Sequence, residues 1–317
     1  MDSGDEFKNL SVGLIGAGRI GLPIATRISG AGFKTVVFDV AEERLAEARA
    51  SGLSTVGDTA GLADADIMII IVAKTAQVIE VFGREPFVSG RMSGKPVVVV
   101  STVGPEAIRR LEPLATRLGV ILVDCPVTGG VDRAEKGELT LFLACVANAV
   151  EKLRPVLAPV GTVVICGEKP GDGQAFKMVN NMLAVTHLSA AAEALALALR
   201  LGLDSNQLLE VLPRGTAASW MLSDRGQRLV GPPEDRVEAS IYLEILAKDA
   251  NLVVETAESV GLSTPVAEAA RQQWHLAVEM GLGCHDDTAI IETYLSRGIE
   301  PADSEAGAHS AAGVLAR

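Results

Sequence analysis

A lysine and an asparagine lie four positions apart in a stretch of helix-forming residues, at Lys177 and Asn181. Residues with this spacing share one face of a helix, so the two side chains point the same way. An ammonium group beside an amide can protonate a forming alkoxide and hold it in one orientation. The pair therefore predicts a general acid/base, Lys177, and an orienting partner, Asn181.

A second group of residues has the spacing of a phosphate-binding loop. The pattern G-x-G-x-x-G follows a short apolar run and opens a helical stretch, in the residues Gly16, Ala17, Gly18, Arg19, Ile20 and Gly21. Glycines allow a tight turn there, and the free N–H groups at the start of the helix bind a pyrophosphate. A glycine-rich turn in an unrelated α/β protein is the alternative, but the position between strand and helix favours a dinucleotide site.

The residue type at the end of the next apolar run bears on the choice of cofactor. Asp39 stands there, 18 residues after Gly21, where a carboxylate accepts the ribose hydroxyls of a dinucleotide. A carboxylate repels a ribose 2′-phosphate, and the residues that follow are Val40 and Ala41 rather than arginine. NAD is therefore the expected cofactor, and Arg44 nearby keeps NADP as the alternative.

Two further segments carry groups that suit an anionic substrate. Segment 124–130 ends an apolar run and contains Thr128, Gly129 and Gly130, a hydroxyl followed by two accessible backbone N–H groups. Such a cradle suits a carboxylate at the carboxyl end of a strand, although an ordinary glycine-rich turn explains the residues equally well. Lys248, followed by Asp249, lies in another predicted helix. A single lysine on a helix is usually a solvated residue.

The composition restricts the class of protein. The chain has 317 residues, enough for about two domains, and a net charge of −12 without a basic stripe, so nucleic acid and anionic membranes are not expected partners. Its four cysteines stand far apart, and no metal site is expected. Residues 1–10 lack the apolar core of a signal peptide, and 183–199 indicates a buried helix rather than a membrane span. We expect a cytoplasmic protein with a small-molecule substrate.

Apolar periodicity predicts a parallel sheet in the first half of the chain. Short Val- and Ile-rich runs alternate with helical stretches up to residue 166, which is typical of a doubly wound sheet covered on both faces. The expected strands are 11–15, 35–38, 54–56, 67–72, 97–100 and 121–124, with 140–145 and 163–166 as further candidates. The expected helices are 19–30, 41–51, 75–82, 105–118 and 149–157.

The pattern changes after a glycine-rich hinge at 167–173, beyond which only helices are expected. They cover 174–201, 206–212, 238–260, 265–280 and 286–295. The predicted fold class is therefore α/β with an all-α second part: a Rossmann-type domain over 1–168, an all-helical domain over 169–300 and a mobile tail over 301–317.

Taken together, these motifs resemble those of the β-hydroxyacid dehydrogenase family, which includes the 3-hydroxyisobutyrate dehydrogenases. The resemblance runs from about Val12 to Ile291 and rests on five ordered segments, 16–21, 101–105, 124–130, 177–181 and 248–249. It implies a Rossmann domain joined by a long helix to an all-α domain that also builds the interface of a homodimer or homotetramer. The active site would lie between the two domains.

The resemblance also implies roles for single residues. Lys177 would be the catalytic acid/base and Asn181 its partner, while Lys248 would close over the cofactor and substrate. The substrate carboxylate would be held by Thr128, Gly129 and Gly130, and the nicotinamide side would be lined by Val72, Ala73, Lys74 and Thr102. Two departures are Val-Ala-Lys at 72–74, where many relatives have Leu-Pro, and a threonine at 128 in place of the commoner serine.

The second half most resembles the threonate dehydrogenase branch, which oxidises four-carbon sugar acids at the hydroxyl next to the carboxylate. This likeness implies substrate contacts for His187 and Trp220, with a core histidine and a packing tryptophan as the alternatives. Two shorter substrates, 3-hydroxyisobutyrate and tartronate semialdehyde, stay open. An imine reductase or a non-catalytic NAD-binding scaffold is a further alternative, and Lys177 counts against both because such relatives tend to lack this lysine.

Overall fold

A twisted sheet of nine strands forms the first half of the molecule. The structure is a computed structural model that describes residues 9–236 and 241–296. The strands are β1 (Ser11–Ile15), β2 (Lys34–Phe38), β3 (Ser54–Thr55), β4 (Ile67–Ile70), β5 (Pro96–Val99), β6 (Ile121–Asp124), β7 (Val127–Thr128), β8 (Leu139–Ala144) and β9 (Gly161–Gly167). They are arranged in the order β3-β2-β1-β4-β5-β6-β8-β7, with β9 paired to β8. The order of β1 to β6 is that of a Rossmann-type fold, as predicted.

Helices cover both faces of this sheet. One face packs against α1 (Gly21–Gly30), α2 (Glu42–Ala50), α5 (Gly130–Lys136) and α6 (Ala147–Leu157), and the other against α3 (Thr75–Phe82) and α4 (Pro105–Leu118). Strand β4 shows why, because Ile67 and Ile69 belong to one apolar core while Met68 and Ile70 belong to the other. Successive side chains of a strand point to opposite faces, so a fully apolar strand needs cover on both.

The sheet is parallel from β1 to β6 and mixed beyond it. Strand β8 runs antiparallel to β6 and β7 and parallel to β9. Between β7 and β8 the chain has ten residues, seven of them in α5, which is shorter than the crossover that parallel neighbours usually need. The predicted parallel sheet is thus confirmed up to β6, beyond which antiparallel pairs join it, and β7 and α5 are elements that the periodicity did not indicate.

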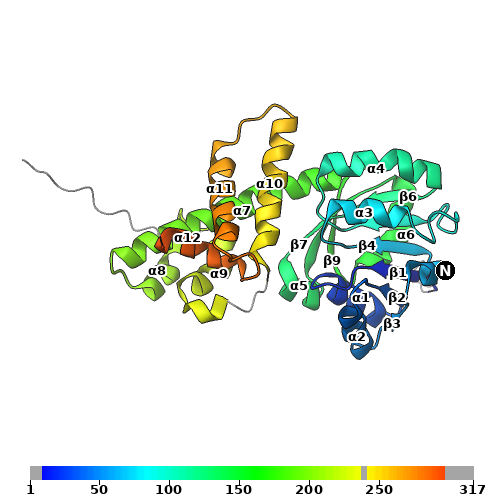
Figure 1. Cartoon of the computed structure of the whole chain (residues 1–317), viewed down its shortest axis with the longest axis horizontal. Helices are drawn as coiled ribbons and strands as arrows, with labels where there is room; N and C mark the ends of the chain where they lie inside the picture. Colours follow the sequence, from blue (N-terminus) through cyan, green and yellow to red (C-terminus); the bar gives the residue numbers. More distant parts are fainter. Residues whose placement is uncertain (1–8, 237–240, 297–317) are drawn as a thin grey trace, which may run out of the picture.

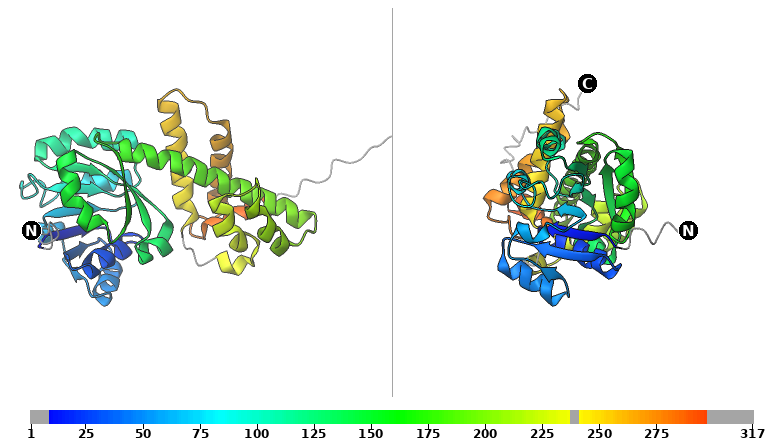
Figure 2. Two further views of the ribbon diagram at one scale, coloured as in Figure 1. Left: turned by 180° about the vertical axis from the view of Figure 1, so that it is seen from behind. Right: turned by 90° about the vertical axis from the view of Figure 1, so that its right-hand side faces the viewer.

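A single long helix, α7 (Asp172–Arg200), leads from the sheet into a helical lobe. Figures 1 and 2 show it running from one lobe into the other. The lobe also contains α8 (Ser205–Val211), α9 (Trp220–Val230), α10 (Leu243–Ser259), α11 (Pro265–Glu279) and α12 (Glu292–Leu295). Its core is mostly Ala and Leu around the fully buried Trp274, whose indole N–H donates to the Val185 carbonyl at 3.3 Å.

The helical lobe differs from the prediction in two places. Helix α9 was not expected, and α10 begins at Leu243 rather than at 238. Tyr242 is extended instead and forms an isolated bridge with Asp286, beside which the Leu243 N–H donates to the His285 carbonyl and the Asp287 N–H donates to the Ile241 carbonyl. Part of the helix predicted over 238–260, and the whole tail predicted over 301–317, lie outside the described residues.

Among the described residues, α7 is the one helix long and apolar enough to cross a bilayer. Here it packs against α9, α10 and α11, and 44% of its most apolar stretch is buried inside the protein. This packing is typical of a core helix in a globular protein. Within the same described ranges, no group of three or more His, Cys, Asp and Glu side chains is placed to hold a metal ion.

Candidate active site

The loop between β1 and α1 needs glycine at two of its positions. Gly16 has φ of +104°, and a Cβ built on it would lie 2.0 Å from the Ile71 carbonyl oxygen. A Cβ on Gly21 would lie 1.9 Å from the Gly16 carbonyl oxygen, so helix and loop are in backbone contact. At Gly18 a Cβ would meet nothing within 4 Å. Gly18 therefore leaves space beside the loop, whereas Gly16 and Gly21 permit the turn itself.

That space belongs to a pocket of about 270 Å³ at the carboxyl ends of β1, β2 and β4. Its lining includes the predicted cofactor residues Gly16, Gly18, Asp39, Val72 and Ala73. The Asp39 carboxylate accepts hydrogen bonds from the Ala17 N–H at 2.7 Å and the Ala41 N–H at 2.9 Å. These bonds fix the acidic group beside the loop, and the pocket fits the adenosine half of a dinucleotide.

The other predicted loop residues have different surroundings. Ile20 packs against the sheet core, and the Arg19 guanidinium lies over the Tyr242 ring, 4.9 Å from its centre. Because Tyr242 precedes α10, this contact joins the glycine-rich loop to the helical lobe. Lys74 is exposed and directly precedes α3, where its backbone N–H donates to the Gln77 side chain.

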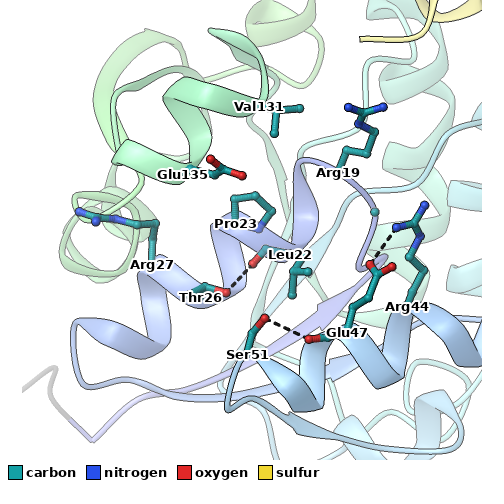
Figure 3. A pocket seen from close by; sticks show the side chains of 11 residues that line it. Arg19, Leu22, Pro23, Thr26, Arg27, Arg44, Glu47, Ser51, Val131 and Glu135 are labelled. Carbon is teal, nitrogen blue, oxygen red and sulfur yellow. Dashed lines mark hydrogen bonds and ion pairs between the residues drawn. The ribbon is translucent and has the colours of Figure 1, made fainter. Parts of the chain in front are cut away.

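Arg44, the arginine nearest to Asp39 in the sequence, faces a second pocket, which shares Gly18 with the first. Figure 3 shows its guanidinium paired with Glu47, at 2.8 Å. This pocket, of about 390 Å³, lies between α1, α2 and α5 and is also lined by Arg27 and Glu135. The positive charge of Arg44 is thus already compensated by a neighbouring carboxylate, which weakens it as a partner for a 2′-phosphate.

Lys177 lies at the junction of the two lobes, on the second turn of α7. Its side chain is 8% exposed, and burial lowers its pKa to about 8. Among the charged groups around it, the Asp249 carboxylate opposes this shift and the Lys248 ammonium adds to it. A lysine with a pKa near neutrality can both accept and donate a proton, as a general acid/base requires.

A chain of hydrogen bonds passes beside Lys177 and includes its predicted partner. The Asn180 amide donates to the Thr128 hydroxyl at 3.3 Å and to the Asn181 side-chain oxygen at 3.1 Å. The Asn181 amide donates in turn to the Asp249 carboxylate at 2.9 Å. This series of bonds therefore joins Thr128 of the predicted carboxylate cradle to Asn181 of α7 and to Asp249 of α10.

Lys248 connects α10 to the sheet on the opposite side of the site. Its ammonium donates to the Thr102 carbonyl at 3.1 Å and lies 3.2 Å from the Asp249 carboxylate. Its side chain is 37% exposed, so it is not the fully solvated residue that a lone helical lysine suggests. Nearby, the Val72 N–H donates to the buried Ser101 hydroxyl at 2.7 Å, which holds the two strand-end loops together.

The glycines of the carboxylate cradle lie near the helical lobe, whereas His187 and Trp220, the residues implied by the threonate dehydrogenase likeness, are exposed elsewhere. Gly129 and Gly130 have φ of +137° and +78°, and a Cβ on Gly130 would lie 3.5 Å from Ile241 of the helical lobe. His187 is exposed on α7, about 15 Å along the helix axis from Lys177. Trp220 is 49% exposed at the start of α9, with the Arg225 guanidinium 5.6 Å from its ring centre. The structure brings Gly130 next to the helical lobe at Ile241 but leaves His187 and Trp220 outside the hydrogen-bonded cluster.

Several residues of the site were not singled out from the sequence. Asn180 and Asp249 stand directly beside predicted residues, so adjacency was the available signal. Asp124 and Gln174, which hold the start of α7, also lie in or beside predicted motifs but were given no role, and Tyr242, which contacts Arg19, had no such signal. Their roles depend on contacts between distant segments.

Comparison with known proteins shows to which family the chain belongs. Residues 11–167 match the family model for the NAD-binding domain of 6-phosphogluconate dehydrogenase, and residues 171–294 match that for the NAD-binding of NADP-dependent 3-hydroxyisobutyrate dehydrogenase. The chain is 33% identical to L-threonate dehydrogenase of Haemophilus influenzae, over 91% of this chain and 96% of that one. It is 29% identical to 3-hydroxyisobutyrate dehydrogenase of Pseudomonas aeruginosa, over 84% and 91%.

The fold comparison agrees. A crystal structure of 3-hydroxyisobutyrate dehydrogenase from Salmonella typhimurium superposes with a TM-score of 0.81 at 30% identity, over 90% of this chain and 99% of that one. The two chains thus share their fold over nine-tenths of this chain. The chain belongs to the 3-hydroxyisobutyrate dehydrogenase family and is an NAD(P)-dependent hydroxy-acid dehydrogenase.

Proposed function

We propose that this enzyme catalyses reversible hydride transfer between NAD and a four-carbon sugar acid such as L-threonate, with Lys177 as the general acid/base. The observation that carries the proposal is the buried Lys177, with its lowered pKa, beside a cradle for a carboxylate. The similarity to L-threonate dehydrogenase along nine-tenths of the chain supports the substrate.

In this mechanism each residue of the cluster has one task. The substrate carboxylate binds at Thr128, Gly129 and Gly130, which places its hydroxyl against Lys177. When bound, NAD supplies the hydride acceptor and NADH the donor. Lys177 removes the hydroxyl proton during oxidation and returns it during reduction, while Asn181, held by Asp249, orients the same hydroxyl. In a chain of net charge −12, these local donors and Lys248 must capture an anionic acid.

The pKa of Lys177 predicts the pH dependence of both directions. Oxidation requires the free amine, so kcat/KM for the hydroxy acid should rise about tenfold per pH unit well below pH 8 and level off above it. Reduction requires the ammonium form and should decline as the pH rises through the same range. Initial rates from pH 6 to 10 test this, and an oxidation rate that falls as the pH rises through 8 contradicts the assignment.

Alternative activities are separated by a panel of substrates. NADH formation is measured with L-threonate, glycerate (the alcohol that is oxidised to tartronate semialdehyde), 3-hydroxyisobutyrate and L-serine, and imine reduction is measured with a cyclic imine and either NADH or NADPH. We expect turnover of the acids and none of the imine, because imine reductases usually lack the lysine. Tight NAD binding without turnover of any acid would favour a scaffold protein instead.

We also propose NAD as the preferred cofactor, a domain boundary between residues 168 and 169, and a cytoplasmic location. Asp39 beside the ribose end of the cofactor pocket and the pairing of Arg44 with Glu47 support the first. The change from sheet to helices between Gly167 and Asp172 supports the second. The acidic charge and the small-acid substrate support the third.

A homo-oligomer is a further part of the proposal. One stripe of α7 and its C-terminal end carries apolar side chains between 49% and 65% exposed, namely Phe176, Val179, Leu183, Leu197 and Leu201. The small residues Ala190 and Ala194 lie in the middle of the stripe, where they allow another helix to approach closely. Figure 2 shows α7 running along the length of the molecule. Such a stripe suits the same stripe of a second copy around a twofold axis.

Light scattering tests this arrangement. The expected mass of the wild-type protein is at least twice the chain mass of 33.0 kDa. Leu197→Asp places a charge in the stripe, far from Lys177, and should shift the mass toward the monomer, whereas Ile79→Asp on the exposed face of α3 should not. A wild-type mass near 33.0 kDa contradicts the proposal.

A further inference from the structure

The first turn of α7 contains a fully buried amide, Gln174, that uses its whole hydrogen-bonding capacity. Its Nε2 donates to the Ser101 carbonyl and to Asp124 Oδ1, both at 3.1 Å. Its Oε1 accepts from the N–H groups of Val103 and Gly104, both at 3.0 Å. One side chain therefore ties α7 to the segments that follow β5 and end β6.

Asp124 completes this junction from the carboxyl end of β6. Its Oδ2 accepts from the backbone N–H groups of Gly171, at 3.1 Å, and Gln174, at 2.9 Å. These donors belong to the start of α7, where the helix lacks internal acceptors and a negative charge is favourable. Gly173 seats the helix on the sheet, since a Cβ there would lie 2.4 Å from the Phe142 carbonyl oxygen.

The junction is linked to both lysines of the site. Gln174 precedes Lys177 by three residues on α7, which is less than one helical turn. The loop that Gln174 holds at Ser101, Val103 and Gly104 includes Thr102, whose carbonyl accepts from Lys248. Movement of the amide would therefore displace Lys177 directly and the support of Lys248 through Thr102.

We propose that Gln174 is a positioning residue for the hydride-transfer reaction, which acts with Asp124 to fix Lys177 relative to Lys248 and the sheet. The inference rests on the proposed role of Lys177. The hydrogen bonds of Gln174 would keep Lys177, on the helix between the two lobes, in one position relative to the loop at 101–104 of the sheet. Lys248 and burial both lower the pKa of Lys177, so loss of the junction should also move that pKa toward its ordinary value.

An exchange of amide and carboxylate tests the junction specifically. Gln174→Glu removes the donor that faces Asp124, which is ionised at pH 8 because burial raises its pKa only to about 6. Asp124→Asn instead sets an amide N–H group against the Gln174 amide. The double variant again pairs a donor at position 124 with an acceptor at position 174, and the remaining defect is the carboxylate oxygen that replaces the donor to the Ser101 carbonyl. Each single variant should lower kcat/KM about tenfold or more, and the double variant should recover at least about threefold over the worse single variant.

Two further measurements separate positioning from general damage. In the single variants, the pH at which kcat/KM for oxidation levels off, near 8 in the wild type, should rise by about one unit. KM should change less than kcat. Thr186→Val on the same helix, which removes a hydroxyl that donates to the Met182 and Leu183 carbonyls of α7, should leave both unchanged. Gln174→Met, of similar length without hydrogen-bonding groups, serves if a single variant fails to fold, and should resemble Gln174→Glu.

Near-wild-type kcat/KM in Gln174→Met, or a double variant no better than the worse single variant, overturns the inference. Failure of the proposed function is distinguishable from this result. In that case Lys177→Ala keeps its activity whatever happens at Gln174, whereas an inactive Lys177→Ala with unaffected Gln174 variants refutes only the positioning role.

Discussion

Replacement of Lys177 by alanine is expected to reduce kcat about 10³-fold or more while the dissociation constant for NADH changes by less than about threefold. The reason is that Lys177 lies at the lobe junction, whereas the cofactor pocket is lined by Gly16, Gly18 and Asp39 on the sheet. Rates are measured by NADH formation from the hydroxy acid, and affinity by NADH fluorescence titration.

Two variants make this prediction specific. Lys177→Met fills most of the buried volume without an amine, so it should be as inactive as the alanine variant but fold as well as wild type. Lys169→Ala removes an exposed lysine eight positions earlier and should keep full activity. Activity of Lys177→Met within about tenfold of wild type would remove Lys177 from the mechanism.

The second large effect is expected at Gly21, where the helix meets the glycine-rich loop. A Cβ there would lie 1.9 Å from the Gly16 carbonyl oxygen and 2.9 Å from Ile71 Cγ2. Because the obstacle is backbone, Gly21→Ala should lower the free energy of unfolding by about 3 kcal/mol or more. Thermal unfolding measures this as a loss of several degrees in Tm.

Gly18→Ala is the matched substitution in the same loop. A Cβ at Gly18 meets nothing within 4 Å, so its Tm should stay close to that of wild type. Because Gly18 lines the cofactor pocket, the methyl group should nevertheless weaken NADH binding about tenfold or more. An unchanged Tm for Gly21→Ala, or unchanged NADH affinity for Gly18→Ala, would contradict this description of the loop.

Local sequence was sufficient for most of the fold. Runs such as Ile67–Ile70, apolar on both faces, predict a central strand wherever they occur, and the switch to helices after Gly167 is visible in the same way. Strand β7 has two residues and pairs only through β8, so no periodicity could reveal it. Helix α9 contains Gly226, a poor helix former, which leaves room for the Leu209 side chain of α8, whose Cδ2 would lie 2.5 Å from a Cβ there.

The candidate site likewise contains residues that local sequence could predict and residues that it could not. The spacing of Lys177 and Asn181 is a local signal, and both side chains are buried near Asp249 as that spacing suggests. The hydrogen bonds of Gln174 join residues about 70 positions apart, and the contact of Arg19 with Tyr242 spans both lobes. A single sequence contains no local pattern for such contacts, because tertiary packing chooses the partner.

The central claim is that this chain oxidises a four-carbon hydroxy acid with NAD, using the lysine on α7. The most direct test is the ratio of kcat/KM for L-threonate to that for 3-hydroxyisobutyrate, measured with saturating NAD at pH 8 to 9. We expect L-threonate to be preferred by about tenfold or more, and both activities to vanish in Lys177→Met. Preference for 3-hydroxyisobutyrate would contradict the assigned substrate, and activity retained in Lys177→Met would contradict the mechanism.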